Sequence, residues 1–262
     1  MKHTAKTGFL ASLAMGAVLA LSASGATAAW NFEPSTVTGG QAKAVSDGIT
    51  ATATAFSIAN GAMGANGQTF ASGATFAAAT LAVWSDSGLG VKSGSDSASP
   101  THAVDNNENT DMVLLSFSSS VILDTVMIGW NGGYDSDISL LRWTGTSAPS
   151  MSGSTWAAVQ ATSSKTGWEL VGNYLDLAVD TPRNVNAADK GSSWWLVSAF
   201  NTGFGTGSVA DKNDDYFKLS TLTGSATPTT PPGKVPEPGS LALMGAALVG
   251  LLGLRRRAAA KH

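Results

Sequence analysis

Between Ala29 and Ser220, short runs of apolar and β-branched residues alternate with polar or glycine-rich stretches, and no long segment repeats its apolar residues at the helical period. Runs of this length, bounded by Gly, Asn, Asp and Ser, predict β-strands joined by turns. The stretch 61–80 is predicted to be a long loop, with a short helix as the alternative. Eight strands are predicted, at 48–58, 80–84, 111–117, 121–130, 137–143, 168–179, 192–200 and 215–221.

Eight strands with turn signals between them predict an all-β fold, an antiparallel β-sandwich of the jelly-roll type, over residues 29–221. The next segment, 222–235, is rich in Thr, Pro and Gly and is predicted to be a semi-rigid tether. The chain has no cysteine, which excludes disulfides, thiolate metal sites and cysteine nucleophiles. The hydrophobic core must therefore stabilise the domain unaided.

The N-terminal segment has the composition of an export signal. A basic start precedes an apolar run at 9–21 that is too short to span a bilayer, and Ala26 and Ala28 then form a small-x-small pattern. This order predicts a signal peptide over 1–28, cut by signal peptidase after Ala28. The protein is therefore expected to leave the cytoplasm.

A second apolar run, 239–254, lies near the other end of the sequence and contains no charged residue. As a helix it would be roughly 24 Å long, against about 30 Å of hydrocarbon, so it is predicted to be a single short transmembrane helix. The basic residues that follow can extend their side chains to the interface, and the positive-inside rule keeps them in the cytoplasm. They are Arg255, Arg256 and Arg257.

The tripeptide Pro236-Glu237-Pro238 directly precedes this run. Its prolines stop a helix from continuing outward, which leaves Glu237 on an extended, accessible stretch. Tripeptide, apolar run and basic tail together (236–262) resemble the PEP-CTERM sorting signal of Gram-negative bacteria that make extracellular polysaccharide. The resemblance implies that a membrane-embedded exosortase recognises these three parts, cuts at or beside the tripeptide and passes the protein from the inner membrane to the cell surface or exterior. A plain membrane anchor is the alternative.

The charge is unevenly distributed. Residues 29–238 hold all 18 acidic residues but only nine of the 15 basic ones, which leaves a net charge of −9. Such a body repels phosphate backbones, so nucleic acid is not an expected partner. It is compatible with divalent cations.

One loop has the spacing of oxygen ligands for such a cation, D-x-N-x-N-x-D. Carboxylate and amide oxygens on alternate residues of a tight loop suit Ca²⁺. An EF-hand is not predicted, because the positions that need glycine and a bidentate glutamate are Thr and Ser. Asp135 or Asp137 are candidate additional ligands, and the alternative is that these residues only favour turns. The candidate calcium ligands are Asp105, Asn107, Asn109 and Asp111.

Two resemblances concern the body. Residues 99–145 resemble the loop and strand pair of discoidin-like, galactose-binding-like sandwiches. The segments 102–105 (His-Ala-Val-Asp) and 135–137 (Asp-Ser-Asp) are similar to those of a family of exosortase-dependent surface proteins. That second resemblance implies no catalytic activity.

Catalytic patterns are absent from the sequence. Outside the segments predicted to be removed, His102 is the only imidazole, and there is no G-x-S-x-G, H-E-x-x-H or P-loop motif. The eight tryptophans are expected to fill the core, although exposed ones could stack on sugars. Trp194 and Trp195 are adjacent on a predicted strand and should therefore face opposite sides.

The sequence therefore predicts an exported, exosortase-processed surface or matrix protein that is not an enzyme and associates with exopolysaccharide. A Ca²⁺-dependent carbohydrate-binding module is the alternative. A polysaccharide hydrolase that uses Asp135 or Asp137 is the third hypothesis, since glycosidases need a carboxyl pair.

Overall fold

The computed structural model describes residues 27–64, 67–94, 96, 99–205 and 215–228. Most of the predicted signal peptide, with Ala26, and the predicted sorting signal lie outside these residues. No helix within the described part is long and apolar enough to cross a membrane. The strands are β1 (Ala28–Asn31), β2 (Ala42–Ser46), β3 (Ile49–Gly64), β4 (Gly67–Phe70), β5 (Ala77–Ala78), β6 (Thr80–Trp84), β7 (Gly88–Lys92), β8 (Val104–Asp105), β9 (Asn109–Trp130), β10 (Ile138–Trp143), β11 (Trp168–Tyr174), β12 (Arg183–Asn184), β13 (Gly191–Ala199) and β14 (Tyr216–Ala226); the helices are α1 (Trp156–Val159) and the 3₁₀ helix η1 (Thr202–Phe204).

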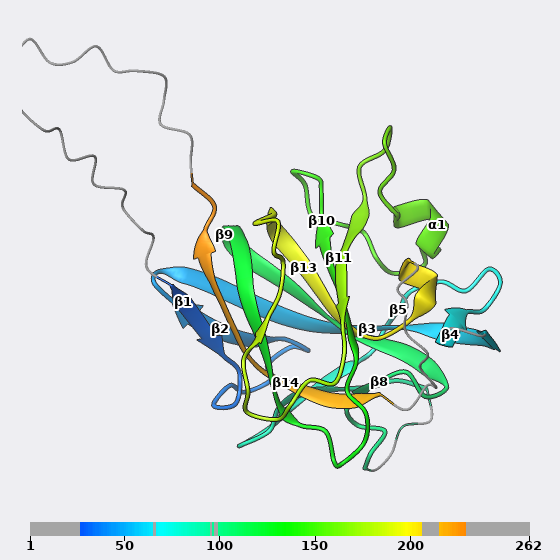
Figure 1. The fold of residues 1–262 in the computed structure, drawn as a ribbon, viewed down its shortest axis with the longest axis horizontal. Helices are drawn as coiled ribbons and strands as arrows, with labels where there is room; N and C mark the ends of the chain where they lie inside the picture. Colours follow the sequence, from blue (N-terminus) through cyan, green and yellow to red (C-terminus); the bar gives the residue numbers. More distant parts are fainter. Residues whose placement is uncertain (1–26, 65–66, 95, 97–98, 206–214, 229–262) are drawn as a thin grey trace, which may run out of the picture.

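The strands form one large antiparallel sheet, as the strand pattern of the sequence predicts (Figure 1). Its main path runs β11-β10-β13-β9-β14-β7-β6, and β9 lies at the centre. The first part of β9 pairs with β3 and β13. Its second part pairs along its length with β14 and over two residues each with β13 and β12. One strand therefore joins two portions of the sheet that have different partners.

The long strand β9 corrects the prediction of two separate strands with a serine-rich turn between them. Ser118 and Ser120 lie in this supposed turn, and the extended backbone continues through both. The Ser118 hydroxyl accepts a hydrogen bond from the backbone N–H of Thr50, and the hydroxyls of Ser120 and Thr227 are 2.8 Å apart. The serine side chains therefore bond to neighbouring segments at the point where β9 changes partners.

Other strand ends also differ from the predictions. The region 61–80, predicted to be a loop, contains the end of β3, all of β4 and β5 and the first residue of β6. The strands β1, β2 and β7 lie outside every predicted run. Ala28, the residue before the predicted signal peptidase cut, begins β1 and is buried. At the other end β14 continues to Ala226, five residues into the predicted tether.

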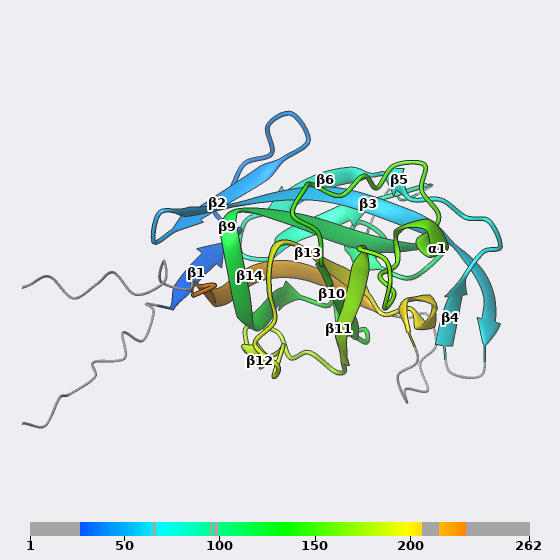
Figure 2. The same ribbon diagram turned by 90° about the horizontal axis from the view of Figure 1, so that it is seen from above.

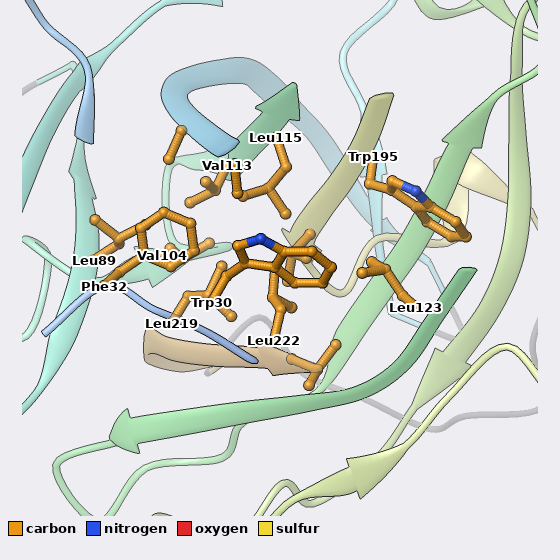
Figure 3. Packing of buried hydrophobic residues seen from close by; sticks show 14 of the residues in the cluster. Trp30, Phe32, Leu89, Val104, Val113, Leu115, Leu123, Trp195, Leu219 and Leu222 are labelled. Carbon is orange, nitrogen blue, oxygen red and sulfur yellow. The ribbon is translucent and has the colours of Figure 1, made fainter. Parts of the chain in front are cut away.

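Both portions of the sheet contribute side chains to the main core. Core-facing side chains of the first part of β9, such as Val113 and Leu115, belong to the same cluster as Leu219 and Leu222 of β14. Trp30 of β1 lies among these residues (Figure 3). Its ring lies 4.8 Å from that of Phe117, and its indole N–H donates to the carbonyl of Ile49.

A second, smaller core covers the opposite face of β3, β9, β10 and β13. The helix α1 and the strand β4 lie at the same end of the molecule (Figure 2). Trp156 of α1 and Phe70 of β4 pack edge to face. Trp195 belongs to the main core and Trp194 packs against the second one. The two adjacent tryptophans therefore face opposite sides of β13, as predicted.

Candidate functional site

The site begins with an aspartate in a row of core positions. In β9 every second side chain faces the main core, so Asp111 continues the row that Val113 and Leu115 occupy. Its side chain is fully buried. A carboxylate therefore stands where the strand pattern would normally place an apolar residue.

Two further carboxylates reach the same point from other segments. Asp105 ends the short strand β8, which pairs with β14 opposite Tyr216. Asp96 lies in the turn after β7, where its Oδ2 accepts a hydrogen bond from the backbone N–H of Ser93. One carboxylate oxygen from each of Asp96, Asp105 and Asp111 lies within 4.8 Å of the others. We call these three residues the Asp111 cluster.

The cluster concentrates negative charge in a site with little solvent. Burial is the main cause that raises the pKa of Asp105 to about 8, and the nearby Asp96 and Glu108 raise it further. Burial, with the charge of Asp105, also raises the pKa of Asp111 well above its ordinary value, although the Ser93 side chain lowers it. Asp105 and Asp111 thus need a proton or a cation to remain buried.

The hydrogen bonds of the cluster are incomplete. Asp105 Oδ1 accepts from the backbone N–H of Asn107, but Asp105 Oδ2 and both carboxylate oxygens of Asp111 are buried without a hydrogen-bond partner among the described residues. None of the three carboxylates forms an ion pair with a described Lys or Arg. Among the described residues, these three buried oxygens therefore have neither a hydrogen-bond donor nor a basic side chain to balance their charge.

Two asparagines of the predicted calcium loop have different positions. The Asn109 amide donates to Ser93 Oγ, at 3.3 Å, so this side chain borders the cluster. Asn107 contacts it through its backbone N–H. The structure thus brings Asp105 and Asp111 together and adds Asp96, which the sequence pattern did not indicate.

A second group of carboxylates, Asp135, Asp137 and Asp215, has ligand oxygens within 4.8 Å of one another. These atoms are hydrogen-bonded. Asp215 Oδ1 accepts from the backbone N–H of Asp137, at 2.6 Å, and Asp137 Oδ1 accepts from that of Asp176, at 2.7 Å. Asp135 and Asp137, considered above as additional calcium ligands, therefore belong to this separate group, which we call the Asp215 cluster.

Asn106 connects the loop that carries Asp105 with the Asp215 cluster. Its amide donates to Asp215 Oδ2, at 2.5 Å, and to the carbonyl of Phe200, at 3.0 Å. Its own Oδ1 accepts from the backbone N–H of Asp215. The side chain is fully buried, so Asn106 fixes the loop position between the two clusters.

A buried lysine of β14 lies close to the rings of two tryptophans. Lys218 Nζ is 3.5 Å from the ring centroid of Trp130 and 4.9 Å from that of Trp84. The His102 ring also contacts Trp84, at 4.6 Å between centroids. Burial lowers the pKa of Lys218 to about 8. No sequence motif indicated this arrangement.

The decisive comparison concerns the C-terminal segment. A family model described as the PEP-CTERM protein-sorting motif matches residues 234–257. The chain carries a PEP-CTERM sorting motif. The PEP-CTERM motif includes Pro236, Glu237, Pro238 and the three arginines, and it implies an exported cell-surface protein that an exosortase sorts and processes. No curated protein and no solved structure matches the chain.

Proposed function

We propose that this protein is a non-enzymatic component of the cell surface or extracellular matrix that associates with exopolysaccharide after exosortase processing. The observation that carries the proposal is the match of residues 234–257 to the PEP-CTERM motif. The association with polysaccharide rests on the resemblance to sorting signals of bacteria that make such polymers. The acidic, cysteine-free β-rich body is compatible with export and with life outside the cell.

The surroundings of the carboxylates favour a non-enzymatic role. A glycosidase needs two carboxyl groups on either side of a bound sugar, at least about 5 Å apart. Asp137 and Asp215 are almost fully buried and accept hydrogen bonds from backbone N–H groups. A sugar ring has no access to these two carboxylates, which argues against a hydrolase that uses Asp137.

The tryptophans disfavour a sugar-stacking surface. Trp30, Trp168 and Trp195 are fully buried, and the other five are only partly exposed. Sugars stack on open aromatic faces. A carbohydrate-binding module would therefore need another kind of contact, so a matrix component remains the better supported function.

The two portions of the sheet are best interpreted as the layers of an antiparallel sandwich. The support is the shared core, to which Leu115 contributes from one portion and Leu222 from the other. Spin labels at the outward-facing positions Thr52 of β3 and Thr223 of β14 test this interpretation. A layered arrangement separates labels on opposite outer faces by more than about 10 Å, the usual spacing of packed sheets, before linker lengths are added.

The sorting function is tested by replacing Pro236, Glu237 and Pro238 with alanine in the producing bacterium. We expect an uncleaved form that stays in the membrane fraction, because the recognition tripeptide is gone. The matched control replaces Pro231 and Pro232, which precede the motif, with alanine. Mass spectrometry of both fractions reports cleavage, and normal processing of the triple variant contradicts the proposal.

The matrix association needs a separate experiment. The wild-type protein is followed in cells that make exopolysaccharide and in cells whose polysaccharide synthesis is deleted. We expect it in the extracted matrix of the first strain and in the culture medium of the second. An unchanged distribution refutes association with the polymer while leaving exosortase processing intact.

A further inference from the structure

The Asp111 cluster contains buried acceptor atoms that no described group satisfies. Asp111 is fully buried and Asp105 is 3 % exposed, yet three of their four carboxylate oxygens have no hydrogen-bond partner among the described residues. Leaving such atoms unpaired in a folded protein carries a large desolvation cost. A cation that these oxygen atoms coordinate from several directions would remove this cost.

We propose that Asp96, Asp105 and Asp111 bind one Ca²⁺ ion. The ligand oxygens lie within 4.8 Å of one another, and Ca²⁺–oxygen distances of about 2.3–2.6 Å allow ligands on opposite sides of the ion to be that far apart. Ser93 Oγ lies 3.4 Å from Asp96 Oδ2 and can add a neutral oxygen. The site goes beyond the proposed surface function, which does not require it.

Protonation alone explains the cluster less well. A neutral carboxylic acid carries an O–H group that must donate a hydrogen bond. Within the part of the chain that the structure describes, neither oxygen of Asp111 has a hydrogen-bond partner of suitable geometry, so a protonated Asp111 would bury an unused donor as well as an unused acceptor. A cation satisfies both oxygens at once.

The chemistry of the ligands selects the ion. The cluster offers carboxylate and hydroxyl oxygens and no sulfur, which disfavours zinc. Mg²⁺ requires a small, near-octahedral shell and retains several waters, whereas Ca²⁺ accepts six to eight oxygens in an irregular arrangement. Three carboxylates from three separate segments, two of them almost without solvent, fit Ca²⁺ better.

The ion would add a further link between three segments that already lie in contact, for example through the hydrogen bond from Asn109 to Ser93. Asp96 belongs to the turn after β7, Asp105 to β8 and Asp111 to β9. Binding to the folded state alone raises stability with ligand concentration. The site therefore makes the stability of this face of the protein depend on extracellular calcium.

The test uses the full-length protein in detergent, stripped with EDTA and titrated with CaCl₂ by calorimetry and thermal unfolding. We expect one equivalent to bind with a Kd of about 10⁻⁴–10⁻³ M, the range of extracellular calcium modules, and the melting temperature to rise with calcium. Asp111→Asn should weaken binding at least about tenfold. The melting temperature of this variant should rise less with added CaCl₂ than that of the wild type, because one of the ligand carboxylates is gone.

Matched variants make the result decisive. Asp180→Asn changes an exposed aspartate outside the cluster, at a left-handed backbone position that asparagine also tolerates, and should bind calcium like the wild type. Asp96→Asn removes a partly exposed ligand and decides the matter if Asp111→Asn does not fold. The proposal is overturned if the wild type neither binds calcium nor melts higher with it, or if both ligand variants bind normally. Equal or tighter binding of MgCl₂ overturns the assignment to calcium, and no result here affects the sorting function.

Discussion

Replacement of Asn106 by alanine should destabilise the protein strongly, because its side chain has three buried hydrogen bonds. Truncation removes the hydrogen bonds that the Asn106 side chain makes with the carbonyl of Phe200, the carboxylate of Asp215 and the backbone N–H of Asp215. Each abandoned buried group costs about 1–3 kcal/mol, and more where the group is charged. Since the three losses share one site and are not additive, we expect a total of about 3–5 kcal/mol.

This magnitude is large against the stability of a domain, which is typically about 5–15 kcal/mol. Urea unfolding followed by tryptophan fluorescence measures it, because Trp30, Trp168 and Trp195 are fully buried and become exposed on unfolding. The midpoint should move to lower urea while the slope of the transition stays constant.

Asn107→Ala is the matched control for this prediction. Asn107 is the next residue, it is partly exposed, and its backbone rather than its side chain forms the described hydrogen bonds. Its truncation should change the unfolding free energy by no more than about 0.5 kcal/mol. Equal midpoints for the two variants would show that the Asn106 bonds do not contribute as argued.

Two further predictions concern the buried aromatic residues and the lysine. Trp30→Ala should lower the unfolding free energy by about 3–5 kcal/mol, as for other buried aromatic truncations. The variant leaves a void in the main core and removes the hydrogen bond from the indole N–H to the carbonyl of Ile49. An unchanged urea midpoint contradicts this prediction. Burial lowers the pKa of Lys218 from 10.5 to about 8, so between these values the unfolded state binds more protons and stability should rise with pH. The slope of melting temperature against pH in this interval should be smaller in Lys218→Met, and identical slopes contradict the assignment.

The strand pattern predicted much of the fold because alternation and turn residues are local signals. The predicted strand 80–84 coincides with β6, and 137–143 nearly coincides with β10. By contrast, β7 was missed because its composition is rich in glycine. A Cβ at Gly90 would collide with the backbone carbonyl of His102 and with the ring of Trp84. This glycine reflects a tertiary contact, which no local pattern can indicate.

The candidate site was predicted only in part for a similar reason. Asp105 and Asp111 lie in one loop and strand start, so their spacing could be recognised in the sequence. Asp96 joins them through the turn after β7, and Asn106 acts through Asp215, which is 109 residues away in the sequence. Both contributions depend on how distant strands pair, and the alternating aspartate–asparagine pattern directed attention to Asn107 instead.

The pairing of β1 with β14 has a consequence for how the sheet folds during export. Ala28 lies opposite Gly224, and Asn31 lies opposite Thr221, so the earliest described strand acquires its only described sheet neighbour from the latest one. In a chain that emerges N-terminus first, β1 cannot form this pairing until residues 221–224 have emerged, and contacts of such long range form slowly. Pairing of the first described strand is therefore among the last steps by which the sheet can be completed.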